Sequence, residues 1–232
     1  MSMKLTYHGH SCFEVRSGDH AILIDPYLSG NKMATLSPDD VQVDAILVTH
    51  GHQDHVGDTV AIARRLKCPV IANYEISMYF AYKKQLKVKP MHIGGAIQLP
   101  WGKVKMTPAL HGSALEIGEG EFVDGGLPGG YLVTMGDRTF YHAGDTALFS
   151  DIKLIGELND IHAAALPIGD RFTMGIDDAI IAAQWLDAGL NIPMHYNTFP
   201  QIEQDPQVWL KKARDQGLQA EVMEIGQTLT IQ

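Results

Sequence analysis

The sequence predicts a mixed α/β fold in which two central sheets are covered by helices on both outer faces. Three observations lead to this prediction. Short apolar segments typical of strands alternate with segments that have helical periodicity. The strand segments fall into two clusters with helices interspersed. The chain has 232 residues, of which 45% are hydrophobic, so it is long enough to bury one large core.

The first hundred residues contain several closely spaced strand segments and two helical ones. A helix is expected over Asp58–Leu66, and another over Tyr74–Gln85. Asp58 is a natural N-cap for the first helix, although it could instead accept a hydrogen bond from a histidine. Strands are expected at Lys4–His8, Cys12–Arg16, His20–Asp25, Val43–Thr49, Pro69–Ala72 and Ile97–Leu99.

The remaining residues continue the alternation. Strands are expected at Val104–Leu110, Gly130–Met135, Thr139–His142, His162–Pro167, Ala220–Glu224 and Thr228–Ile231, and helices at Phe149–Glu157, Asp177–Leu186 and Pro206–Arg214. The glycine-rich segment 124–130 lacks the Lys-Ser/Thr ending of a phosphate-binding loop, so it is interpreted as a flexible hairpin or rim loop. No linker or charge block interrupts the chain, which predicts a single domain over residues 1–232.

Residues 49–55 read Thr-His-Gly-His-Gln-Asp-His and directly follow a buried apolar run. His50, His52, Asp54 and His55 therefore stand within six positions of one another. Three imidazoles and a carboxylate are the ligands that zinc, manganese, iron and nickel prefer. The alternative is a histidine-rich turn after a strand, but four such side chains at this spacing favour a metal site.

Three further residues of the same chemical types lie at similar places in the pattern. His111, Asp145 and His195 each come just after a short apolar segment that is typical of a strand. Strand ends at one edge of a sheet are where binding loops converge. These residues are therefore predicted to complete the site begun by residues 50–55.

This order of residues resembles the metallo-β-lactamase superfamily. Its signature elements are an early Asp, a His-x-His-x-Asp-His array, a lone His, a lone Asp and a final His, which correspond here to Asp25, residues 50–55, His111, Asp145 and His195. A narrower resemblance is to uncharacterised metal-dependent hydrolases related to ascorbate-6-phosphate lactonase. It rests on the motifs Gly-His-Ser-Cys at 9–12, Leu-Ile-Asp-Pro at 23–26, Tyr-His-Ala-Gly-Asp-Thr at 141–146, Pro-Ile-Gly-Asp-Arg-Phe-Thr-Met-Gly at 167–175 and Met-His-Tyr-Asn-Thr-Phe-Pro at 194–200.

The resemblance implies a four-layer αββα sandwich and two divalent transition-metal ions per chain, either zinc or manganese, iron or nickel. It also implies a role for each matched residue. The first ion would be bound by His50, His52 and His111, the second by Asp54, His55 and His195, and both would be bridged by Asp145. Diiron oxygen-reducing members usually have a carboxylate at the position of His52, so the imidazole there favours hydrolysis.

Other residues near these motifs have two possible roles each. Asp25 is either a strand-end turn residue or, as the resemblance implies, a carboxylate that orients the histidine loop, and the second role is favoured. His8 and His10, two apart on one strand face, could approach the site together. For these two histidines and for His142, a structural role is expected in preference to metal binding, because the seven better-matched residues already fill two sites.

Three residues are candidates for substrate binding. Arg171, in the loop 169–175, could pair a substrate carboxylate or phosphate through its guanidinium, or form only a surface salt bridge. Tyr196 and Asn197 follow His195 directly, so their polar tips could bind substrate or stabilise an oxyanion. Alternatively, Asn197 only shapes the turn before Pro200.

The composition bears on the cellular compartment and on the kinds of binding partner. Cys12 and Cys68 are the only cysteines, and with a short polar start to the chain they are expected to be reduced thiols in the cytoplasm. No apolar run approaches the length of a membrane span. The formal net charge of −9 makes a nucleic acid partner unlikely, whereas an anionic small molecule stays compatible because metal ions supply positive charge. A homo-oligomer is compatible with these features.

The expected activity is hydrolysis of a small ester, lactone or phosphodiester by a hydroxide that the metal centre activates. Asp54, besides binding metal, would orient this nucleophile and accept its proton, which makes it the catalytic residue. One alternative is a nuclease related to transfer-RNA processing enzymes, which the acidic net charge disfavours. Another is a metal-binding regulatory protein without turnover.

Overall fold

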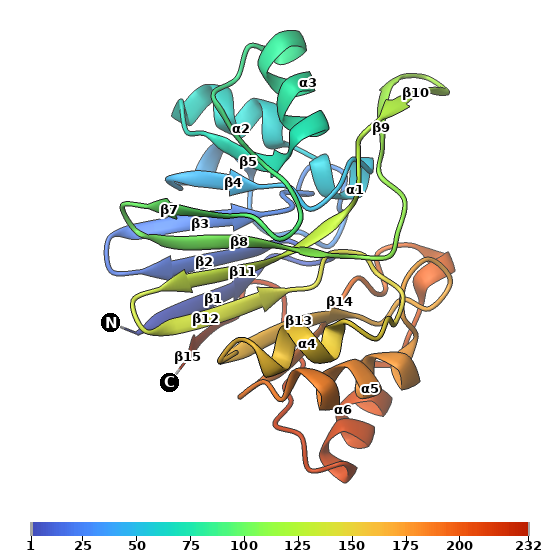
Figure 1. Ribbon diagram of the computed structural model, residues 1–232. Helices are drawn as coiled ribbons and strands as arrows, with labels where there is room; N and C mark the ends of the chain where they lie inside the picture. Colours follow the sequence, from blue (N-terminus) through green and yellow to red (C-terminus); the bar gives the residue numbers. More distant parts are fainter. Residues whose placement is uncertain (1, 232) are drawn as a thin grey trace.

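A computed structural model describes residues 2–231, in which two sheets stack between two layers of helices (Figure 1). The end residues of the predicted domain, 1 and 232, lie outside the described residues. This arrangement confirms the mixed α/β fold with two central sheets. One outer layer contains α2 (Thr59–Leu66) and α3 (Tyr74–Lys84), and the other contains α4 (Ile152–Glu157), α5 (Ile176–Leu186) and α6 (Pro206–Asp215).

The first sheet has seven strands in the order β15-β1-β2-β3-β4-β5-β6. They are β1 (Met3–Tyr7), β2 (Phe13–Ser17), β3 (His20–Ile24), β4 (Ala45–Leu47), β5 (Val70–Asn73), β6 (Val88–Met91) and β15 (Thr228–Ile231). Strands β3 to β6 run parallel to one another, and β4 and β5 are buried along their whole length. Parallel strands covered on both faces are typically continuous apolar runs, and the Ala-Ile-Leu sequence of β4 has this character.

The second sheet has six strands in the order β14-β13-β12-β11-β8-β7. They are β7 (Ala96–Leu99), β8 (Gly102–Pro108), β11 (Gly129–Met135), β12 (Arg138–His142), β13 (Ala163–Pro167) and β14 (Asn191–Met194). The alanines of β13 are all buried, and α5 packs against this strand with three buried alanines of its own, at positions 179, 182 and 183. Small side chains on both elements let the helix backbone approach the sheet closely.

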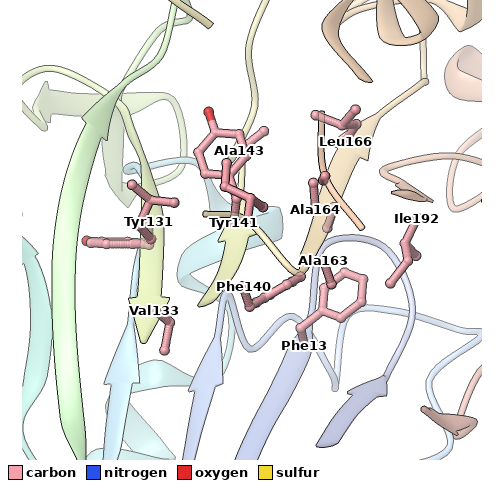
Figure 2. Close-up of a cluster of buried hydrophobic side chains, with 14 of the residues drawn as sticks. Phe13, Tyr131, Val133, Phe140, Tyr141, Ala143, Ala163, Ala164, Leu166 and Ile192 are labelled. Carbon is pink, nitrogen blue, oxygen red and sulfur yellow. The ribbon is translucent and has the colours of Figure 1, made fainter. Parts of the chain in front are cut away.

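The core lies between the two sheets. Phe13 on β2 of the first sheet contacts Phe140 on β12 of the second, with ring centroids 5.5 Å apart. Figure 2 shows these two rings beside Ala163 and Ile192, which come from β13 and β14. One hydrophobic cluster thus joins both sheets, and it supports the sheet ends from which the site is built.

Several predicted boundaries were wrong. Segment Ala220–Glu224 forms only one isolated bridge, between Ala220 and Asn191, because Glu224 already belongs to a turn with Gln227. The strand predicted to reach Leu110 ends at Pro108, and Leu110 turns to donate its N–H to Thr146 Oγ1 at 3.0 Å. The hairpin of β9 (Ala114–Gly118) and β10 (Glu121–Asp124), strand β6 and the short helix α1 (Gln53–Val56) were not predicted.

Asp58 is the N-cap residue of α2, as predicted, and its carbonyl oxygen accepts the N–H of Ile62 at 3.0 Å, but its side chain has another role. The carboxylate makes no capping hydrogen bond to the helix. Instead, Asp58 Oδ2 accepts the N–H groups of Leu28 and Ser29, at 3.0 and 2.8 Å. Two backbone donors from the loop after β3 outcompete the helix N-terminus, so Asp58 ties this loop to α2. Among residues 2–231, no helix is long and apolar enough to cross a membrane.

Candidate metal centre

All seven predicted ligands lie in loops or helix turns that directly follow strands. His50 and His52 follow β4, and Asp54 and His55 lie on α1, the next element of the chain. The other three come from the second sheet and follow β8, β12 and β14: they are His111, Asp145 and His195. The two sheets therefore contribute opposite sides of one site, and the structure brings all seven side chains together.

The first group consists of His50, His52 and His111. His50 Nε2 lies 2.9 Å from His52 Nδ1, which lies 3.3 Å from His111 Nε2. These nitrogens converge on a common point, as ligands of one ion would. Close packing holds the loop in place: a Cβ atom on Gly51 would lie 2.9 Å from the carbonyl carbon of Ala114, so the loop needs glycine at this position. Figure 1 shows α1 next to the base of the β9–β10 hairpin, where this contact is made.

The second group consists of Asp54, His55 and His195. Asp54 Oδ2 lies 3.8 Å from His55 Nε2 and 3.7 Å from His195 Nε2. His195 has a left-handed backbone with φ of 55°, which is uncommon for a residue other than glycine. Such strain is characteristic of functional sites, where the surrounding structure enforces it.

Asp145 lies between the two groups. Its Oδ1 is 3.3 Å from His55 Nε2, and its Oδ2 is 2.9 Å from His195 Nε2. The same Oδ2 is 3.5 Å from His111 Nε2 and 4.0 Å from His50 Nε2. A single buried carboxylate thus faces histidines of both groups.

Asp25 fixes the orientation of two site histidines. Its Oδ2 accepts a hydrogen bond from His55 Nδ1 at 2.8 Å and another from the Thr49 hydroxyl at 2.7 Å. Because the Thr49 proton is donated to Asp25, the Thr49 oxygen is left to accept from His50 Nδ1, 3.0 Å away. The Nε2 atoms of His50 and His55 are therefore both directed into the site, which is the arrangement that metal-binding histidines need.

The electrostatics of the two groups differ. Burial lowers the pKa of His50, His52 and His111, so these imidazoles stay neutral. Burial also acts to lower the pKa of His55 and His195, but Asp145 outweighs it and raises the pKa of His195 to about 9 and that of His55 well above its usual value. Protonated histidines beside Asp145 thus supply the positive charge that a cation would supply.

The donor atoms fit cation binding. His55 Nε2 and Asp145 Oδ1 are buried 3.3 Å apart, and within residues 2–231 neither forms a well-directed hydrogen bond, which is costly unless another group satisfies them. Three sets of donor atoms lie within 4.8 Å of one another: His50 with His52 and His111; His50 with His55 and Asp145; and His10 with Asp54, His55 and His195. Transition-metal ions prefer such nitrogen and carboxylate donors.

The site is partly exposed. His50, His55, Asp145 and His195 are buried, whereas His52 is partly exposed and the side chains of Asp54 and His111 are 26% and 14% exposed. A small molecule can therefore reach the cluster at these partly exposed side chains.

His8 and His10 do not share a strand face as predicted, because β1 ends at Tyr7 and the chain turns through Gly9 with φ of 96°. Both ring nitrogens of His8 are buried without a hydrogen-bond partner. His142 Nε2 donates to the carbonyl oxygen of Ser11 at 2.9 Å, which agrees with its predicted structural role. His10, in contrast, reaches Asp54, so it does approach the site as the sequence allowed, although not through a strand face shared with His8.

The candidate substrate residues differ in their surroundings. Arg171 is exposed and lies over the Phe172 ring at 5.5 Å; within residues 2–231 it forms no salt bridge. Asn197 is exposed, and its side-chain oxygen accepts the N–H of Gln204 at 2.8 Å, which agrees with the turn-shaping alternative. Tyr196 is half-buried against the main core, and burial raises its pKa to about 12, so its phenol stays neutral.

Comparison with known proteins agrees with this geometry. The family model of the beta-lactamase superfamily domain matches residues 20–196. A relative from Bacillus subtilis (strain 168), named UPF0173 metal-dependent hydrolase YtkL, is 52% identical over 99% of this chain and 100% of its own length. The solved structure of Igni18, described as a metallo hydrolase from the archaeon Ignicoccus hospitalis, has a TM-score of 0.91 at 35% identity and covers 100% of this chain and 99% of that one.

These matches cover most of the chain and agree with the fold. An isothiocyanate hydrolase from Delia radicum gut bacteria has a TM-score of 0.78 at 18% identity, covers 98% of both chains and shows the same fold. The chain therefore belongs to the beta-lactamase superfamily and, within it, to the UPF0173 family of metal-dependent hydrolases.

Proposed function

We propose that the chain hydrolyses a small ester, lactone or phosphodiester with the help of two divalent transition-metal ions. The observation that carries this proposal is the position of Asp145, whose two oxygens face His55 at 3.3 Å and His111 at 3.5 Å. One carboxylate between two groups of imidazoles is suited to bridge two ions. We assign His50, His52 and His111 to a first metal position and Asp54, His55 and His195 to a second.

When two such ions are bound, they lower the pKa of a shared water and polarise the bond that is cleaved. The protein's own residues hold and move protons around that reaction. Burial acts to raise the pKa of Asp54, but His55, His10 and His195 outweigh it and hold the pKa well below its usual range. Asp54 is thus ionised at neutral pH and lies at the open side of the site. We infer that the ionised carboxylate accepts a hydrogen bond from the attacking water and orients it. Its proposed second role, as acceptor of the proton of that water, requires a pKa closer to neutral than the three neighbouring histidines give it.

The substrate side of the proposal rests on size and on sequence resemblance. Most of the cluster is buried and is exposed only in part, at His52, Asp54 and His111, which suits the reactive end of a small molecule. The motifs at 9–12 and 141–146 resemble relatives of ascorbate-6-phosphate lactonase, so lactones are the first class to test. Arg171 is exposed beside Phe172 and is available to pair an anionic group of the substrate.

The test is turnover by the metal-loaded protein. The protein is stripped with a chelator, reloaded with zinc or manganese, and assayed against pooled lactones, carboxylic esters, phosphodiesters and RNA. We expect hydrolysis of one small-molecule pool, its loss on chelation, and its loss in Asp54→Asn assayed with enough metal to fill both positions. Hydrolysis of RNA alone would support the nuclease alternative, and no turnover by protein that holds two ions would support a regulatory role.

A further inference from the structure

His10 lies against the second metal position, although neither its place in the sequence nor the family pattern assigns it a role there. His10 Nε2 is 3.0 Å from Asp54 Oδ2, and the His10 side chain is fully buried. Its ring centroid is 4.2 Å from that of His195 and 5.5 Å from that of His55. His10 therefore contacts or adjoins all three residues of the second position.

The backbone holds His10 firmly in this location. Its φ of 55° lies in the left-handed region, which costs energy for a residue with a Cβ atom. Two hydrogen bonds to its carbonyl oxygen offset this cost, one from the N–H of His195 at 2.8 Å and one from the Tyr7 hydroxyl at 3.1 Å. The turn after β1 is thereby joined to the loop after β14, so an element of each sheet positions the imidazole.

The hydrogen bonds of the imidazole define which nitrogen carries the proton. A carboxylate oxygen can only accept, so His10 Nε2 carries a proton and donates it to Asp54 Oδ2. The other nitrogen, Nδ1, lies 2.9 Å from the Thr198 hydroxyl, which also lies 3.5 Å from the carbonyl oxygen of Tyr196. Asp54 and Thr198 thus hold the two nitrogens of the ring.

We propose that His10 is a positioning residue that orients the Asp54 carboxylate for the second metal position and, through Asp54, tunes the affinity of that position. This inference rests on the proposed two-ion centre. His10 Nε2 is also close enough to belong to a metal-binding set with Asp54, His55 and His195. However, both of its nitrogens lie within 3.0 Å of a hydrogen-bonding partner, whereas His55 Nε2 has only looser contacts to Asp145 and Asp54, at 3.3 and 3.8 Å, which favours positioning over direct binding.

Two substitutions separate the side-chain role of His10 from its backbone role. In His10→Gln the amide can occupy the place of Nε2 and still donate to Asp54. In His10→Asn the amide occupies the place of Nδ1, so it retains only the contact to Thr198. Asparagine tolerates the left-handed backbone better than glutamine does. If the hydrogen bond to Asp54 is what matters, His10→Gln should keep the zinc affinity of the second position. If only the left-handed turn matters, His10→Asn should keep it instead.

The measurement is the affinity of the full-length protein for zinc alone at each position, by competition with a chelator, with circular dichroism as a check of folding. We expect His10→Asn and His10→Leu to lower the affinity of the second position for zinc about 10- to 100-fold and to leave the affinity of the first position unchanged. We expect His10→Gln to stay close to wild type, and Thr198→Val to cause a smaller loss than His10→Asn. His20→Gln is the matched control, because His20 makes a similar contact to Asp44, at 3.1 Å, but on the surface.

Three results would overturn the positioning role. Unchanged binding of the second ion in both His10→Asn and His10→Leu would remove any role for the side chain. Better binding in His10→Asn than in His10→Gln would make the turn the important feature. X-ray absorption of the cobalt-loaded protein with one fewer nitrogen ligand in His10→Gln would make His10 a ligand. A wild-type protein that binds only one ion would contradict the two-ion centre itself, and the positioning proposal with it.

Discussion

Asp25 Oδ2 accepts a hydrogen bond of 2.8 Å from His55 Nδ1, and both side chains are completely buried. The same oxygen accepts the Thr49 hydroxyl, which in turn contacts His50. One carboxylate therefore orients a histidine of each proposed metal position, one directly and one through a hydroxyl group. A buried carboxylate with two such donors is well satisfied, so this arrangement is rigid as well as oriented.

This relationship predicts different effects for two substitutions. Asp25→Asn replaces an acceptor with a group that can also donate, so it should lower the metal affinity of both positions, by about 10- to 100-fold each. Thr49→Val keeps the β-branched shape and removes only the hydroxyl, so it should lower the metal affinity of the first position alone. Chelator competition on both variants measures the two affinities. An equal loss at the second position in Thr49→Val would contradict the proposed relay.

Metal content is the second prediction. The seven side chains around Asp145 should bind two ions per chain when metal is plentiful. Elemental analysis gives the number, and anomalous scattering from crystals should locate one ion at His50, His52 and His111 and one at Asp54, His55 and His195, with Asp145 between them. A single ion that persists in excess metal, with His195 turned away, would rule out the assignment.

The third prediction separates catalysis from folding. His55→Ala or His195→Ala should impair the second metal position and remove most hydrolysis, while the chain stays folded. The reason is that the core between the sheets, rather than the metal, carries most of the stability at this length. Circular dichroism and thermal melting beside activity assays test this. Loss of folded, soluble protein in both variants would instead mean that the metal is chiefly structural.

The fourth prediction concerns the pH dependence of the metal-free protein. Burial opposes protonation of His195, but Asp145 raises its pKa from 6.5 to about 9. A raised pKa in the folded state stabilises the fold fully below pH 6.5, and this contribution is lost as the pH rises to about 9. The free energy of unfolding in a chelator should therefore fall over this range, and less steeply in His195→Gln. An identical slope for the variant would show that His195 is not protonated.

The fifth prediction tests the substrate role of Arg171. If its guanidinium pairs an anionic group remote from the reacting bond, Arg171→Ala should lose about 1.5–3 kcal/mol with anionic substrates. That corresponds to a roughly 10- to 150-fold lower kcat/KM, with little change for neutral substrates. Arg171→Lys should restore little, because an ammonium group lacks the planar fork. Equal activity of wild type and Arg171→Ala on matched anionic and neutral esters would leave Arg171 a surface residue.

The types of element were largely predictable, but some boundaries and pairings were not. The fully buried strand β4 and the amphipathic α2 follow from local apolar patterns. Strand β6 was missed because its Val-Lys-Pro-Met sequence has no apolar alternation, and it pairs only because β5 offers a free edge. The exposed hairpin of β9 and β10 likewise buries little, so its sequence carries no clear period.

The sequence by itself determined which seven side chains gather, because each is a metal-binding type that follows an apolar strand, and strand ends of one sheet edge converge. Only the tertiary structure decided the contacts that orient them. His10, Asp54 and Thr198 are joined by hydrogen bonds across 44 and 188 positions of the sequence. Such contacts depend on which strands become neighbours and on how the two sheets stack, which no local pattern of residues encodes. The hydrogen bonds from the loop after β3 to the Asp58 side chain are likewise tertiary, so the sequence predicted the N-cap position of Asp58 but not these bonds.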